Sequence, residues 1–192
     1  MTNEEFVELA CPHSWFLVAD DLHLQAVELR QRFGRGHLTH IDHRSKIKVS
    51  WDNANRSTFL LASFALENSI KAFLVYENPG WISNGTLAKN LRSHELTDLA
   101  KMSTNIPYKE KGKKTLRAFE EGNESWARYP CALKKEDSAQ PLILNEELWD
   151  RYEHLMAAYG RRLIHLLSTP WKGPHGFRAR YEIKGNYLGA SR

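Results

Sequence analysis

The spacing of apolar residues predicts a protein built almost entirely from α-helices. The most informative segment is FLLASFALENSIKAFLVYENP at 59–79, which is apolar on almost every side in its first two turns. A helix this apolar belongs at the centre of a bundle. We expect the helix to cover 52–78, because Pro79 and Gly80 follow it and break helical structure.

Four more segments carry helical patterns. Residues 14–33 place apolar side chains at close to helical spacing and are followed by two glycines. A late segment begins after Asn145, a good N-cap, and has two glutamates in its first turn. Helices are therefore expected over 14–33, 94–103, 108–122 and 146–168.

The segments between these helices are of three kinds. Residues 37–50 form a basic, histidine-rich connection, and 122–141 read as an ordered loop because Trp126 and Tyr129 favour burial. The tail 170–192 predicts either a small hairpin or a flexible basic arm. We expect one all-α, up-and-down bundle of about five helices over 1–169, with a basic, aromatic C-terminal extension over 170–192.

Composition places the chain among soluble globular proteins. Its 192 residues are 42% hydrophobic and 26% charged, which are ordinary values for one domain. The N-terminus is acidic and lacks the basic region of a targeting signal. No run approaches the roughly 18 apolar residues of a membrane span, and Cys11 and Cys131 are interpreted as free thiols. A cytoplasmic location without membrane association is expected.

Positive charge is concentrated in two segments. The formal net charge is +4, yet residues 30–48 carry six Lys or Arg against one acid, and 170–192 carry five against one. Such clusters attract polyanions, although a solvated surface gives the same pattern. The tail aromatics either stack on bases or hold the tail on the bundle. The candidate nucleic-acid contacts are Arg32, Arg35, Lys172, Arg178, Arg180 and Lys184.

The central helix carries a polar inlay. Glu67 and Lys71 are four residues apart and share a face, with Asn68 beside them. One interpretation is a buried clasp that bonds His94 or the loop around Arg128 and fixes the register of the bundle. The other is the floor of a ligand pocket lined by Glu67, Asn68, Lys71 and Tyr129 with Arg128 at its rim.

Three histidines recur at 37, 40 and 43, a spacing that a helical turn would align toward a metal. The surrounding basic residues oppose cation binding, so no metal and no cofactor is expected.

Three sequence words resemble the prokaryotic branch of the HEPN family. They are FALENSIKAFLV at 64–75, LRSHELTDLAK at 91–101 and WARYP at 126–130, in the family's order and spacing. The resemblance covers about residues 50–130. It implies a helical bundle that is often a homodimer, and frequent membership in bacterial defence or toxin–antitoxin systems.

The resemblance also implies a test for catalysis. Nuclease members cut RNA without metal through an Arg-x4–6-His motif on a late helix, where Arg stabilises phosphate charge and His moves a proton. The pairs at this spacing, Arg30–His37, Arg32–His37 and Arg35–His40, all lie in the connection after the first helix. The chain thus departs from the family's catalytic pattern, and we expect no robust RNA cleavage.

The leading hypothesis is a non-catalytic protein that associates with RNA or DNA. One alternative is a metal-independent endoribonuclease with a divergent catalytic site of Arg92, His94 and Arg128. Another is a small-molecule or nucleotide-binding bundle without catalysis. A cognate nucleotidyltransferase or antitoxin protein is an expected partner.

Overall fold

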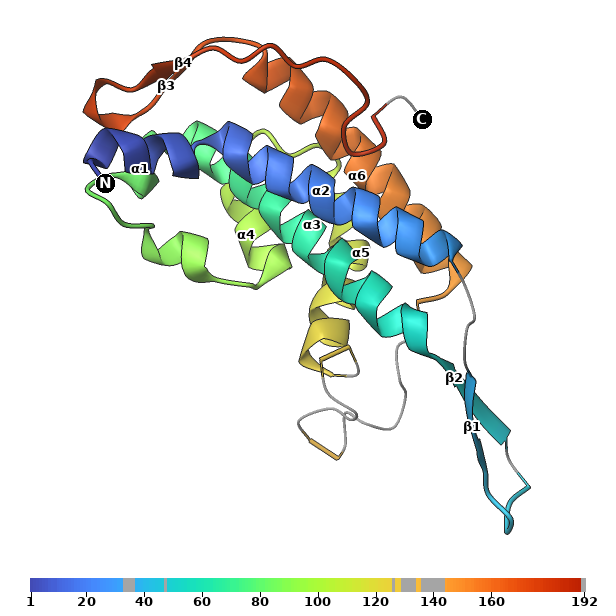
Figure 1. The fold of residues 1–192 in the computed structure, drawn as a ribbon. Helices are drawn as coiled ribbons and strands as arrows, with labels where there is room; N and C mark the ends of the chain where they lie inside the picture. The colour runs from blue at the N-terminus through green and yellow to red at the C-terminus, as the bar shows by residue number, and fades with distance from the viewer. Residues whose placement is uncertain (33–36, 47, 126, 129–133, 136–143, 191–192) are drawn as a thin grey trace.

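The chain is a helical bundle, which confirms the expected all-α class (Figure 1). The computed structural model describes residues 1–32, 37–46, 48–125, 127–128, 134–135 and 144–190. Two antiparallel two-stranded hairpins are the only sheets within these ranges.

Six α-helices and four short strands occur in the described part of the chain. The helices are α1 (Asn3–Ala10), α2 (Pro12–Gln31), α3 (Asn53–Glu77), α4 (Leu96–Met102), α5 (Lys109–Glu124) and α6 (Glu146–Leu167). The strands are β1 (His37–Ile41), β2 (Lys48–Asp52), β3 (Trp171–Lys172) and β4 (Arg178–Ala179). Single 3₁₀ turns are η1 (Pro79–Ile82), η2 (Lys89–Arg92) and η4 (Pro174–Gly176).

Helix α3 is the core helix, as its apolar sequence predicts. Leu66, Phe73 and Leu74 are fully buried in it. Leu60, Leu61 and Phe64 on the same helix are half-buried. They lie in the half of α3 that leads toward the projecting β1–β2 hairpin (Figure 1), on other faces of the helix than Phe59, Ala62 and Ala65, which are fully buried.

Within the described part of the chain, one helix is long and apolar enough to cross a membrane by length and composition alone. This helix is α3 over Asn55–Glu77, and 78% of its most apolar window is buried inside the protein. The helix passes this test although it holds no unbroken run of about 18 apolar residues, because Glu67, Asn68 and Lys71 interrupt its apolar sequence. The burial in this structure is that of a core helix.

The helix α1 was not predicted, although its start signal is in the sequence. The Thr2 hydroxyl accepts from the Glu5 amide at 3.1 Å, and the Glu5 carboxylate accepts from the Thr2 amide at 2.6 Å. This reciprocal capping box supplies partners for two amides that a helix start leaves unsatisfied.

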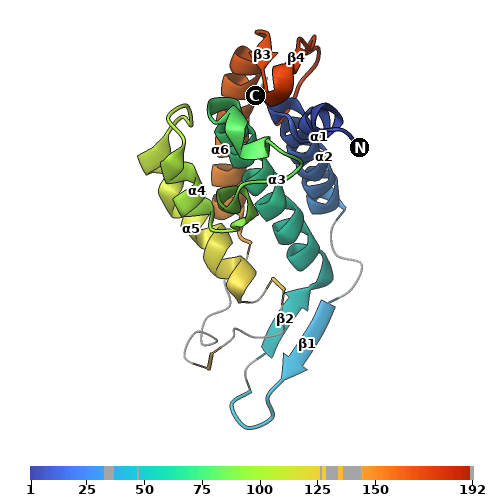
Figure 2. The ribbon, with the colours of Figure 1, turned by 90° about the vertical axis from the view of Figure 1, so that its left-hand side faces the viewer.

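The connection between α2 and α3 is also more regular than predicted. Strands β1 and β2 pair from His37 opposite Asp52 to Ile41 opposite Lys48. The hairpin continues from the ends of α2 and α3 and projects away from the bundle (Figures 1 and 2). Because this segment is a strand and a turn, it lacks the helical alignment of histidines that a metal site would have needed.

The C-terminal tail forms a small hairpin and then a strap that lies on the bundle. Trp171, Phe177 and Leu188 are buried in the same core cluster as the helices, and Tyr181 and Tyr187 pack against it half-buried. The tail is thus a packed part of the fold. Its aromatic side chains hold it there and are not displayed for stacking on bases.

Candidate functional site

The polar inlay of α3 is a buried ion pair. The Nζ of Lys71 lies 2.6 Å from the Oε1 of Glu67, and these residues are 3% and 6% exposed. Lys71 also lies over the ring of Trp15 on α2, 5.5 Å from its centroid. One turn of α3 thus places both charges on the same face, and each offsets the cost of burying the other.

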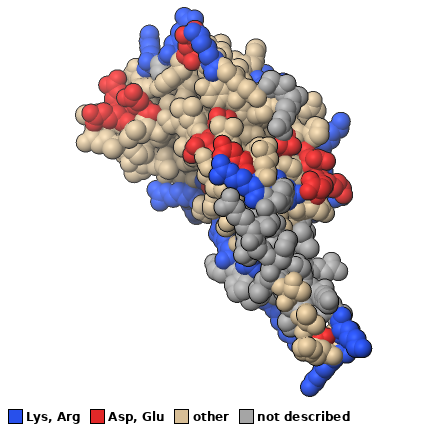
Figure 3. All heavy atoms as spheres, turned by 45° about the vertical axis from the view of Figure 1, so that its right-hand side comes forward, with Lys and Arg blue, Asp and Glu red and all other residues tan. Residues whose placement is uncertain are grey.

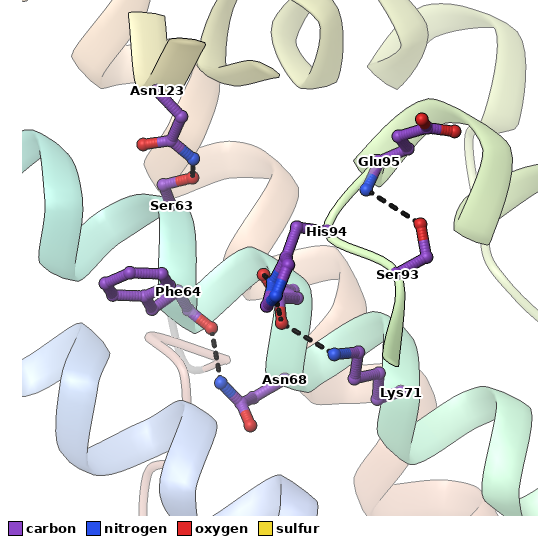
Figure 4. Close-up of polar contacts among 9 residues, drawn as sticks. Ser63, Phe64, Asn68, Lys71, Ser93, His94, Glu95 and Asn123 are labelled. Carbon is purple, nitrogen blue, oxygen red and sulfur yellow. Dashed lines mark hydrogen bonds and ion pairs between the residues drawn. The ribbon is translucent and has the colours of Figure 1, made fainter. Parts of the chain in front are cut away.

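The carboxylate of Glu67 also holds His94, as the clasp interpretation predicted. The Nδ1 of His94 lies 3.0 Å from Oε2 and 3.1 Å from Oε1 (Figure 4). The imidazole approaches from the loop before α4, and its side chain is 62% exposed. With the proton on Nδ1, that atom donates to Glu67 and Nε2 is left as an acceptor.

Arg128 approaches the same region of α3. Its guanidinium carbon lies 5.8 Å from the centroid of the Phe64 ring, a cation–π contact. Phe64 is three residues before Glu67, about 4.5 Å along the helix axis. Arg128 is exposed, and the neighbour recorded for it is the Phe64 ring and not Glu67 or His94. Tyr129, its predicted companion, lies outside the described residues.

The Asn68 side chain bonds within its own helix, because its amide donates to the Phe64 carbonyl at 2.7 Å.

Arg92 is directed away from Glu67 and toward its own loop. Its Nε and Nη2 donate to the carbonyl of Leu87 at 3.2 and 3.0 Å. Of the three residues expected to be catalytic, His94 and Arg128 therefore converge on one turn of α3, whereas Arg92 supports its own loop.

Buried contacts leave little room for the predicted ligand pocket. Glu67 and Lys71 are directed toward each other, His94 and Trp15. The arrangement instead resembles a buried carboxylate that orients a solvent-facing imidazole, which is how proteins position a histidine for proton transfer.

The basic segment after α2 is divided by the fold. Arg30 is buried, with its Nη2 2.5 Å from Glu146 on α6, so it supports the bundle. Arg32 is exposed and lies 3.3 Å from Glu28, while Arg35 falls outside the described residues. Among the side chains that the structure describes in this region, the other exposed cations are Arg44 and Lys46 at the hairpin turn.

The hairpin turn is organised by Asp42. Its carboxylate accepts from the Arg44 amide at 2.9 Å and from the Ser45 hydroxyl at 2.5 Å. These two bonds lower the pKa of Asp42. Lys46 closes the turn with a left-handed φ of 56° and donates its amide to the Asp42 carbonyl at 2.8 Å. The result is a structured, cation-bearing tip (Figure 3).

The tail cations form a separate cluster. Lys172, Arg178, Arg180 and Lys184 are all exposed, and Lys184 pairs with Glu182 at 2.9 Å. The Nε1 of Trp171 donates to the carbonyl of Tyr76, so the tail hairpin lies at the C-terminal end of α3. Strand β2 leads into the opposite end. The two basic clusters are therefore separated by the length of α3 (Figure 2).

A polar group around Cys11 was missed from the sequence. The thiol lies 3.4 Å from the Ser14 hydroxyl and 3.9 Å from the Tyr181 hydroxyl, and the His13 ring stacks on Tyr181 at 4.0 Å. Burial opposes ionisation of the thiol, but the polar side chains of His13, Ser14 and Tyr181 around it outweigh burial and lower the pKa of Cys11 to about 7. The spacing of residues in the sequence could not have predicted this contact, because Tyr181 is 170 residues away from Cys11 in the chain.

The fold and these sites define an all-α bundle with a loop histidine oriented by a carboxylate of the central helix and a basic hairpin at each end. Scans of protein-family models, curated proteins and solved structures find no match to this chain. Among the described residues, no group of three or more His, Cys, Asp or Glu is placed to hold a metal ion.

Proposed function

We propose that this protein binds RNA or DNA through phosphate contacts made by the β1–β2 hairpin. The observation that carries the proposal is the position of the cationic turn at Arg44 and Lys46, on a ribbon that projects beyond the bundle. A two-stranded ribbon is narrow enough to enter a groove of a nucleic acid. Cations at its tip would gain affinity from counterion release.

The tail cations provide a second, distant contact. The 25 residues of α3 span about 37 Å at 1.5 Å per residue. The five-residue strands of the hairpin add about 16 Å beyond α3. A duplex rises about 3.4 Å per base pair, so about 16 base pairs are needed to reach from the hairpin tip to the tail cations. Because the tail aromatics are packed inward, both contacts would read the backbone and not the bases.

The test is fluorescence anisotropy with 8- and 24-base-pair duplexes over a salt series. We expect the log–log slope of affinity against salt to be steeper on the longer duplex. The double variant Arg44→Ala/Lys46→Asn should lower this slope by about 1.8 on duplex DNA, because two phosphate contacts are lost. Asparagine at position 46 tolerates the left-handed φ and so preserves the turn.

The matched control is Lys89→Ala/Lys114→Ala, which removes the same charge from exposed positions on η2 and α5. An equal loss of slope in this control would mean that net charge, and not the hairpin, determines binding. Charge changes are preferred to deletion of 170–192, because Trp171, Phe177 and Leu188 belong to the core. Absence of binding even at low salt would discard the nucleic-acid function.

A second function, metal-independent RNA cleavage, is favoured by the Glu67–His94 pair. His94 presents an exposed imidazole fixed by a buried carboxylate, and Arg128 lies one turn of α3 away. These are the two groups that proton transfer and phosphate stabilisation need. The Arg92 contacts argue that this third residue is dispensable.

The corresponding assay follows cleavage of mixed RNA in EDTA. If the chain is a nuclease, His94→Ala and Arg128→Ala abolish cleavage, whereas Arg92→Ala retains most of it. Uncut RNA with the parent protein would restrict the proposal to binding. The HEPN-like assignment, a role in defence, a homodimeric state and an antitoxin or nucleotidyltransferase partner are consistent with either function and are part of the same proposal.

A further inference from the structure

A hollow lies between α5 and α6, away from the residues considered above. Its volume is about 320 Å³, within the range of small-molecule sites. Gly112 on α5 faces Leu155 on α6, and a Cβ at this glycine would lie 3.1 Å from the leucine side chain. Leu155 and Ala158 form an apolar floor, and the exposed ring of Tyr108 stands at the edge.

The Lys and Arg side chains that line this hollow are Lys111, Arg151 and Arg161, and no Asp or Glu from the described part of the chain lines it. Lys111 lies over the Tyr108 ring at 5.9 Å, and among the described residues no carboxylate is within ion-pair distance of its ammonium. Arg151 bonds Glu147 through Nη1 at 2.7 Å, yet its Nε is buried with no acceptor among the described residues. Arg161 donates to the carbonyl of Ala190 at 3.2 Å.

We infer that this hollow binds a small organic anion with a flat apolar body, such as an aromatic carboxylate or phosphate ester. The floor and Tyr108 would cover the body, and Lys111 and Arg151 would pair with the anionic group. A second copy of the chain fits poorly, because a two-fold contact places each patch on itself and would oppose like charges. This inference goes beyond the proposed function and does not depend on it.

The probe is 8-anilinonaphthalene-1-sulfonate, an apolar aromatic anion whose fluorescence rises on binding. We expect one site per chain, displaced by phenyl phosphate and benzoate but not by benzyl alcohol or inorganic phosphate. Lys111→Glu should weaken binding at least tenfold. The control Lys114→Glu makes the same charge change on the same helix outside the hollow and should leave binding unchanged. Circular dichroism confirms that both variants are folded.

The backbone amide shifts of Gly112 and Ala158 then locate the site. Shifts caused by phenyl phosphate alone would assign a phosphate ester, and shifts caused by benzoate alone a carboxylate. The inference is overturned if the two lysine variants weaken binding equally, if benzyl alcohol displaces the probe as well as the anions do, or if the probe does not bind. It is also overturned if an RNA oligomer displaces the probe and the small anions fail, because the hollow is then part of a nucleic-acid surface.

Discussion

Removal of the Glu67 carboxylate is expected to be among the most destabilising single changes in this protein. In Glu67→Ala, the Lys71 ammonium keeps only the Trp15 ring as a recorded partner while 3% exposed. Breaking a buried pair in this way costs about 3–5 kcal/mol. A domain of this size is stable by about 5–15 kcal/mol, so the variant would lose a large fraction of its stability.

Guanidinium chloride unfolding followed by circular dichroism measures this loss. With an m-value of about 4 kcal/mol per molar, the denaturant concentration at the unfolding midpoint should fall by about 1 M. Two comparisons isolate the cause. His94→Ala removes the exposed partner and should cost less than about 1 kcal/mol. Glu67→Leu/Lys71→Met replaces both charges with apolar groups and should recover most of the stability.

The reasoning is refuted if Glu67→Ala shifts the midpoint by no more than His94→Ala does. It is also refuted if the double variant is less stable than Glu67→Ala, because the unpaired Lys71 charge would then not be the source of the loss.

Three other predictions follow from close contacts and titration. Gly122→Ala should cost about 1–3 kcal/mol, because its Cβ would overlap the buried Phe59 ring; an unchanged thermal midpoint would contradict this. Gly160→Ala places a Cβ 2.8 Å from the Tyr187 carbonyl and 3.0 Å from Leu188, so limited proteolysis should cut the tail faster than in the parent. The Cys11 pKa falls from 9.0 to about 7 on folding, so between pH 7 and 9 the unfolded state binds the extra proton and stability should rise with pH, by at most about 1.4 kcal/mol per unit. This contribution is lost as the pH falls through 7, and Cys11→Ser should flatten the profile in chemical denaturation.

The helices that the sequence predicts well have apolar residues at helical spacing over many turns and a helix-terminating residue at the end. The boundaries of α3 and α6 agree with the prediction to within one residue, and Asn145 caps α6 by accepting from the Leu148 amide at 2.8 Å. Helix α1 was missed because its signal is a capping box of polar residues and not a period. The β1–β2 hairpin was missed because basic residues obscure its alternation.

The site was predictable where residues are neighbours on one helix. The four-residue spacing of Glu67 and Lys71 predicts their pair, and the need of a buried carboxylate for donors led to His94. The direction of Arg92 depends on the loop carbonyl at Leu87, which no spacing encodes. The hollow beside Gly112 depends on the packing of two helices whose contact residues, such as Leu155, lie some 40 positions apart.

The strap at the C-terminus has a consequence for how the chain is made. Its last residues return to the first helices: the Leu188 amide donates to Asp20 at 2.7 Å, and Tyr187 packs on Phe16 at 5.2 Å. A ribosome delivers the N-terminal helices long before their covering strap. Until residues 187–188 have left the ribosome, the surface around Phe16 lacks this cover, so the nascent chain passes through a stage at which a chaperone can act on an otherwise nearly complete bundle.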